Sequence, residues 1–193
     1  MPLSLIVGFV LLLASTTSFS GEDESKYRSR DDATNILGPL RESLQNAIDN
    51  QAARDRITVE LRISGGAPSE AYHLLLRISN GGTVHYQYRD RLRGIAERIG
   101  TAELPSEELA ELLKQIHASG LIDAAGSVAR LVPDTTVGML EITDGQSHFR
   151  TWFAADAEQA KAQGVIPSPE LITVVEALYA IGREVVGVES VKA

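Results

Sequence analysis

The chain has 193 residues, of which 44% are hydrophobic and 23% are charged, and it has no cysteine. These proportions are ordinary for a globular protein and exclude wholesale disorder. The absence of cysteine excludes disulfide bonds, thiolate zinc sites and a cysteine nucleophile. The net charge of -8, from 18 basic and 26 acidic side chains, argues against a nucleic-acid partner, because phosphate binding needs a concentrated basic surface.

Residues 1–20 have the pattern of a signal peptide. The apolar run over residues 3–14 is too short to span a bilayer comfortably, and Ser18 and Ser20 are small residues suited to cleavage before Gly21. We therefore expect a periplasmic or secreted protein. The alternative is an N-terminal membrane anchor, with residues 1–20 uncleaved as the protein's contact with the membrane.

Residues 21–32 are mostly charged or serine and predict a tether. An amphipathic helix is predicted at residues 33–54, where leucines recur at spacings of three and four residues. We place Pro39 near its first turn, where the missing N–H costs little. We expect this helix to pack on a sheet, and the alternative is a segment that docks on a partner protein.

Three consecutive strands are predicted between residues 57 and 89, because apolar and polar side chains alternate over this stretch. A three-residue turn at residues 80–82 places the apolar side chains of the second and third strands on one face. The same turn places Arg77 opposite His85 on the other face. A two-residue turn at Asn80-Gly81 would mix apolar and polar side chains on each face.

The region after these strands begins with residues 91–103, which show no sustained period and predict a long loop. The next helix is predicted from about residue 105 to residue 119. A last helix begins at Ser168, followed by a proline in the first helical position, and ends near Gly182. Residues 185–193 are left as a tail.

A second hairpin is predicted at residues 136–153, with a two-residue turn at Asp144-Gly145. This turn places Glu141 opposite His148. The same face of the hairpin is unusually apolar for a solvated surface and carries Val137, Met139 and Trp152. We expect a helix to cover this face, and the alternative is an exposed patch around Trp152 that binds a partner.

Strands and helices that are grouped in this way predict an α+β domain over residues 56–184, with an antiparallel sheet of about five strands and helices packed on it. No catalytic constellation is visible in the sequence. The glycine pairs lack the following helix and lysine of a phosphate loop, no serine lies in a nucleophile elbow, and the histidines have no ligand spacing. We therefore expect a protein that is not an enzyme and has no metal site and no cofactor.

Several segments together resemble the emfourin family, small bacterial protein inhibitors of thermolysin-like metalloproteases. They are the strand from Ile57 to Gly66, the helix at residues 104–116, Pro133-Asp134 before the strand at residues 138–143, and the helix opened by Pro169. The resemblance covers about residues 56–183. It implies an inhibitor that presents the loop of Gly65, Gly66, Ala67 and Pro68 to a metalloprotease.

Two function classes follow for this chain. The first is an exported, non-enzymatic binding domain with a protein partner, contacted through residues 65–68 or through Trp152. The alternative is a structural or accessory subunit of a bacterial envelope assembly, which would use the N-terminal helix and the Trp152 face.

Overall fold

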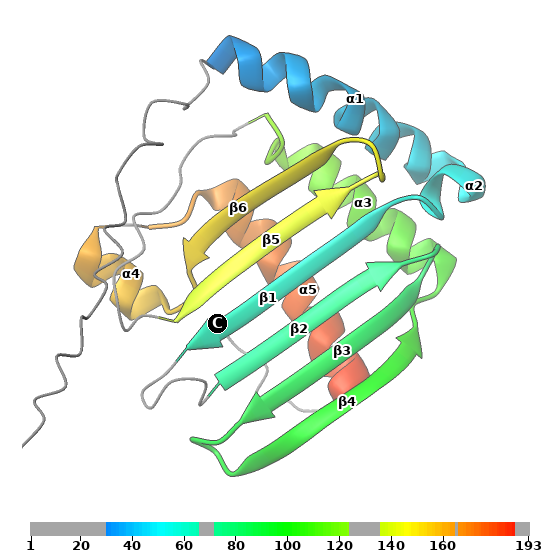
Figure 1. Cartoon of the computed structure of the whole chain (residues 1–193). Coiled ribbons are helices and arrows are strands. Elements are labelled where there is room, and N and C mark those ends of the chain that lie inside the picture. The colour runs from blue at the N-terminus through cyan, green and yellow to red at the C-terminus, as the bar shows by residue number, and fades with distance from the viewer. Residues whose placement is uncertain (1–29, 66–71, 124–135, 165, 188–193) are drawn as a thin grey trace, which may run out of the picture.

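The computed structural model describes residues 30–65, 72–123, 136–164 and 166–187, which form one antiparallel sheet with helices packed on it (Figure 1). The sheet has six strands in the order β4-β3-β2-β1-β5-β6. The predicted α+β class and the antiparallel sheet are confirmed, with six strands rather than five.

The strands are β1 (Thr58–Gly65), β2 (Tyr72–Ser79), β3 (Thr83–Asp90), β4 (Ile95–Glu103), β5 (Val137–Thr143) and β6 (His148–Ala154). The helices are α1 (Arg30–Asp49), α2 (Gln51–Arg54), α3 (Ser106–Ser119), α4 (Ala157–Gln163) and α5 (Pro169–Val186). Strand β1 lies between the two hairpin systems, since it pairs with β2 on one side and with β5 on the other.

The predicted turn between β2 and β3 is confirmed. Ile78 pairs with Val84, and Arg77 pairs with His85, as the three-residue turn requires. Asn80 in this turn has a φ of 49° and Gly81 has a φ of 74°. Glycine and asparagine tolerate this left-handed conformation, so the turn selects these residue types.

The predicted turn between β5 and β6 is wrong by two residues. Glu141 pairs with Arg150 rather than with His148, which leaves a four-residue connection. The Asp144 side chain accepts hydrogen bonds from the backbone N–H groups of Gln146 and Ser147, and these bonds close the wider turn. Because a shift of two residues preserves the alternation, every side chain keeps its predicted face.

The predicted loop at residues 91–103 is also wrong, because β4 occupies most of it and pairs with β3. Strand β4 is the edge of the sheet, and most of its side chains are exposed. It therefore shows no apolar alternation. Gly100 lies opposite Tyr86, and a Cβ atom at Gly100 would approach the Tyr86 hydroxyl to 2.6 Å, which explains the glycine within a strand.

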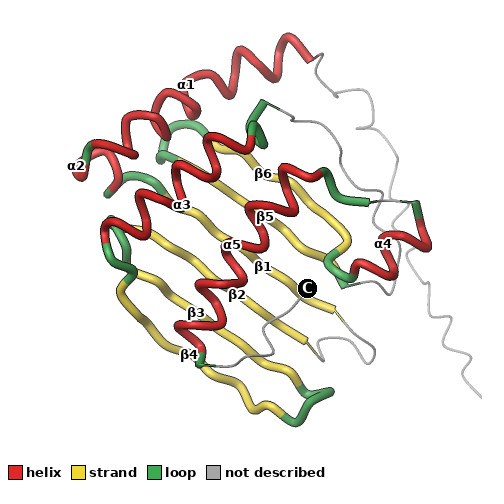
Figure 2. The backbone as a smooth tube through the Cα atoms, turned by 180° about the vertical axis from the view of Figure 1, so that it is seen from behind, coloured by secondary structure: helices red, strands yellow, loops and turns green. Residues whose placement is uncertain are grey.

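Helices α3 and α5 cross the same face of the sheet and cover it (Figure 2). The core lies between these helices and the inward side chains of the strands. Its largest fully buried side chains include Leu61, Ile63, Leu74, Leu76, Ile78, Tyr88, Leu113, Ile116, Leu140 and Ile142. Helix α5 continues four residues beyond its predicted end at Gly182, to Val186, and α4 was not predicted.

Helix α1 packs beside α3, and its side chains Leu40, Leu44 and Ala47 are fully buried. The helix was expected to pack on the sheet, but it packs mainly on α3 and contacts the sheet chiefly at β6. It begins at Arg30, so Pro39 lies inside the helix rather than in its first turn.

Arg54 joins the first two helices to the third. Its buried guanidinium donates hydrogen bonds to the carbonyl oxygens of Ala47 at 3.0 Å, Ile48 at 2.7 Å and Ser106 at 3.0 Å. The bonds to Ala47 and Ile48 satisfy carbonyl groups near the end of α1 that have no partner within the helix, and the bond to Ser106 reaches the start of α3. The buried Arg54 guanidinium therefore links α1 and α2 to α3 through its hydrogen bonds.

The predicted signal peptide or anchor at residues 1–20, most of the predicted tether, the loop residues Gly66, Ala67 and Pro68, and residues 188–193 lie outside the described residues. Within the part of the chain that is described, no helix is long and apolar enough to cross a membrane.

Candidate functional site: an open face of the sheet

The sheet face opposite α3 and α5 carries no helix of the described segments (Figures 1 and 2). We call it the open face. Its central side chains are Ile99 and Thr101 of β4, His85 and Gln87 of β3, Leu75 and Arg77 of β2, Glu60 and Arg62 of β1, Met139 and Glu141 of β5, and Arg150 and Trp152 of β6.

The prediction that a helix covers Val137, Met139 and Trp152 is wrong for every helix in the described segments (Figure 2). The apolar stripes of α3 and α5 both lie on the other face, where the larger aliphatic side chains of the strands are buried. Both faces of the second hairpin carry apolar side chains, but only one of them belongs to the core.

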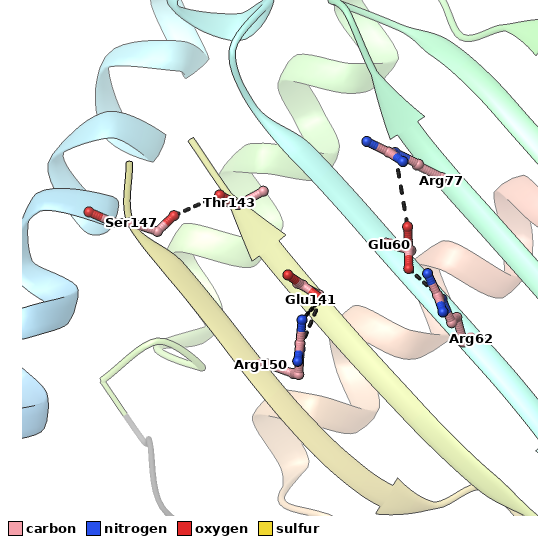
Figure 3. Close-up of polar contacts among 7 residues, drawn as sticks. All are labelled: Glu60, Arg62, Arg77, Glu141, Thr143, Ser147 and Arg150. Atoms are coloured by element: carbon pink, nitrogen blue, oxygen red, sulfur yellow. Dashed lines mark hydrogen bonds and ion pairs between the residues drawn. The ribbon is translucent and has the colours of Figure 1, made fainter. Parts of the chain in front are cut away.

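One row of side chains across the open face is charged, and Glu60 lies at its centre. The Glu60 carboxylate accepts a hydrogen bond from Arg62 Nε at 2.5 Å, and Arg77 Nε lies 3.9 Å away (Figure 3). The Glu60 side chain is only 10% exposed, whereas those of Arg62 and Arg77 are 57% and 53% exposed. The arginines therefore neutralise a buried carboxylate and keep further N–H donors directed at solvent.

The same row continues across β5 and β6. Glu141 pairs with Glu60 across β1 and β5, and like charges at such positions repel. Arg150 offsets this repulsion, since it donates to Glu141 Oε2 through Nη2 at 2.7 Å and Nε at 2.9 Å (Figure 3). Two adjacent glutamates flanked by Arg77 and Arg150 thus make this row nearly neutral.

The neighbouring row is more apolar. Trp152 pairs with Met139, and Met139 pairs with Arg62 in β1. Trp152 is 39% exposed and Ile99, at the other end of the row, is 70% exposed. The predicted grouping of Trp152 with Met139 is confirmed: Met139 is buried, and Trp152 beside it is partly exposed with no described helix over it (Figure 2).

Gly65, the other predicted contact residue within the described segments, ends β1 and has a structural role. Its φ is 156°, and a Cβ atom there would lie 2.5 Å from the Thr136 Cα atom. Gly65 and Trp152 lie two strands apart and three residues along the sheet, or about 14 Å. The structure does not bring them into one site.

The charged residues around Glu60 were not predicted as part of a site. Arg62 and Arg77 were visible as outward positions of alternating strands, but the pairing of β1 with β5 joins segments more than seventy residues apart in sequence. That pairing places Glu141 and Arg150 in the same row.

The histidines do not gather in a metal site. His73 pairs with Arg89 and His85 pairs with Arg77, so the two histidines lie on different cross-strand rows. Among the described residues, no group of three or more histidine and carboxylate side chains could hold a metal ion.

A scan against protein-family models and a search of the curated proteins found no match to this chain. The resemblance to the emfourin family stays a prediction.

Proposed function

We propose that this protein is an exported, non-enzymatic binding domain that contacts a protein partner through the open face. The observation that carries this proposal is Trp152, a large aromatic side chain left 39% exposed on a sheet face that no described helix covers (Figure 2). Tryptophan and arginine are the residue types most enriched among interface hot spots, and the open face carries both.

The chemistry of the open face suits a protein surface. Trp152, which lies beside the buried Met139, offers an apolar contact, while Arg62 offers guanidinium N–H groups to carbonyl or carboxylate oxygens of a partner. Non-obligate interfaces combine apolar and polar contacts of this kind.

The size of the open face is also suitable. Six strands about 4.8 Å apart, each about seven residues long at 3.4 Å per residue, make a face of roughly 700 Å². Each partner in a standard interface buries about 800 Å². A partner would therefore use most of the open face rather than Trp152 alone.

The test is co-purification from the source organism with an affinity-tagged chain. Trp152→Ala combined with Arg62→Ala should abolish recovery of the partner that wild type retains. Lys114→Ala, an exposed change on α3 behind the sheet, is the matched control and should retain it. Equal recovery with the double variant would remove the open face from the proposal.

A narrower form of the proposal is inhibition of a thermolysin-like metalloprotease, supported by the resemblance of the segment ending at Gly65-Gly66. Wild-type protein at micromolar concentration should then inhibit such a protease, and Gly66→Val should weaken inhibition without a large loss of stability. Absence of inhibition by wild type would exclude this form and leave the open-face proposal standing.

Export is supported by the apolar run at residues 3–14 and the small residues that follow it. The intact mass of protein recovered from its natural host should correspond to a chain beginning near Gly21. A mass that includes residues 1–20 would instead favour an anchored protein, as in the alternative of an envelope-assembly subunit.

A further inference from the structure

A separate cavity of about 190 Å³ lies between the end of β6, α4 and the first half of α5. Phe153, Ala160, Leu171 and Val175 form buried parts of its wall. The cavity is not part of the open face, because Phe153 and these helix residues belong to the covered side of the sheet.

The mouth of this cavity is apolar and exposed. Ile166 and Ile172 line it, with 68% and 39% of their surface exposed. Water solvates such side chains poorly, so a concave apolar site with an exposed apolar rim favours occupation by an apolar group.

Among the described residues, Glu176 is the one charged side chain that lines the cavity. It lies one helical turn after Ile172, so both side chains project from the same side of α5. Glu176 is exposed and forms no hydrogen bond or ion pair with another residue of the described segments. Its carboxylate is therefore available to a cation at the mouth.

Tyr179, the other polar residue of the lining, carries no charge. Burial raises the pKa of its hydroxyl well above the ordinary value, so the group stays protonated. The described side chains inside the cavity are thus neutral, and the charge of Glu176 lies at the rim.

We propose that this cavity binds a small cationic amphiphile, a single apolar ring or short alkyl group that carries an ammonium group. An apolar cavity of about 150 Å³ accommodates benzene, so 190 Å³ admits one ring with a short side chain. The ring occupies the cavity and the ammonium group pairs with Glu176. The like charge of Glu176 and the net charge of -8 disfavour the corresponding carboxylate.

The test uses the full-length protein and two probes of similar size, 2-phenylethylamine and 3-phenylpropionate, titrated by calorimetry and by ligand-observed NMR. The amine should bind saturably, and the carboxylate should bind at least fivefold more weakly. Glu176→Gln should weaken amine binding about two- to fivefold, which is the effect of losing an exposed ion pair. The same change should reduce the difference in affinity between the amine and the carboxylate. Glu184→Gln, two turns further along α5, is the matched control and should change neither affinity.

The position of the site is tested with Ala157→Phe, which adds a ring at an exposed residue of the lining and should block both probes without unfolding the protein. Circular dichroism verifies folding of each variant. Absence of saturable amine binding to wild type would overturn the proposal, as would equal binding of the two probes. Amine binding that Ala157→Phe leaves unchanged would place the probe elsewhere and overturn it as well.

Discussion

Trp152 and Phe153 are neighbours in β6, yet they lie on opposite faces of the sheet and in opposite surroundings. Phe153 is 4% exposed beneath the helix layer, and Trp152 is 39% exposed on the open face. On the covered face, aliphatic and aromatic side chains pack against α3 and α5. On the open face, two adjacent glutamates are flanked by arginines across the strands, and Trp152 is left partly exposed beside them.

The two faces of the sheet have different roles: the covered face stabilises the fold, and the open face is the proposed binding surface. Burial of apolar area on the covered face supplies most of the folding free energy, and any change of volume there is costly. The open face contributes little to the folding free energy, so its residues can be suited to binding a partner at a small cost in stability. The contrast can be tested by paired substitutions.

The largest expected effect comes from the two neighbours in β6. Phe153→Ala should lower the free energy of unfolding by about 3 to 5 kcal/mol, because it removes a buried ring and leaves a cavity. Trp152→Ala should lower it by less, about 1 to 2 kcal/mol, because 39% of this residue is already exposed to solvent and no described helix packs over it (Figure 2). Urea denaturation followed by circular dichroism measures the free energy of unfolding of each variant.

Trp152 is the only tryptophan, so acrylamide quenching of wild-type fluorescence reports on it alone. We expect efficient quenching in the folded protein. Strong protection, or losses of stability that are similar for the two variants, would show that the open face is covered in solution.

The next effect concerns Gly138, which lies opposite Phe153 on the covered face. A Cβ atom at Gly138 would lie 2.2 Å from Cζ of the Phe153 ring, which packing holds in place. Gly138→Ala should therefore cost about 1 to 3 kcal/mol by overpacking. Thermal and urea unfolding of the variant measure this loss.

The control for Gly138 is the double variant with Phe153→Leu, in which the smaller side chain leaves room for the alanine methyl group. The double variant should lose less free energy of unfolding than the two single variants lose together, because residues 138 and 153 are in contact. Additive losses would mean that Gly138 is required for a reason other than the Phe153 ring.

The features that were predicted correctly are those that a local pattern determines. Alternation assigned β1, β2 and β3 to the right faces, and the requirement for one apolar face selected the turn at residues 80–82 over the shorter one. Strand β4 was predicted as a loop, because an edge strand with most of its side chains exposed to water shows no apolar alternation.

The candidate site was predicted only in part, because it depends on which surfaces meet. Alternation grouped Trp152 with Met139, but it does not say which face of a two-sided apolar hairpin the helices cover. The stripes of α3 and α5 fit either face by spacing alone. Likewise, nothing near Glu60 in the sequence indicates that Glu141 lies opposite it, since their strands meet only in the folded sheet.

A smaller effect is expected from the ion pairs of the open face. Arg150→Gln removes the partner of Glu141 and leaves this carboxylate beside Glu60. The loss of stability should be about 0.5 to 1 kcal/mol at low salt, as for other exposed ion pairs, and should shrink as salt screens the charges. Urea denaturation at two salt concentrations measures the loss of stability and its dependence on salt.

The double variant Glu141→Gln with Arg150→Gln should recover part of the loss, because it removes the repulsion with Glu60. No salt dependence for Arg150→Gln would mean that this arginine acts through packing of its aliphatic stem rather than through charge.

The smallest effect should come from the rim of the sheet, where Ser43 of α1 donates a hydrogen bond to Asp144 Oδ2 at 2.6 Å. Partial burial disfavours the charged form of Asp144, but the hydrogen bonds from Ser43 and from the backbone N–H of Ser147 outweigh it, and the pKa of Asp144 lies below its ordinary value. A lowered pKa stabilises the folded state above the unfolded pKa of about 3.9, and this stabilisation is lost as pH falls through the folded pKa.

Ser43→Ala should therefore raise the pKa of Asp144 and remove a few tenths of a kcal/mol at pH 6 to 7, after allowance for solvent screening at this partly exposed site. Alanine also favours a helix more than serine does, but that gain does not depend on pH. The free energy of unfolding of wild type minus that of Ser43→Ala should thus decline as pH falls below about 4 and become constant below the folded pKa of Asp144. A difference that does not change with pH would show that the Ser43–Asp144 bond does not contribute through the charge of Asp144, and that α1 is held at the sheet by its buried leucines alone.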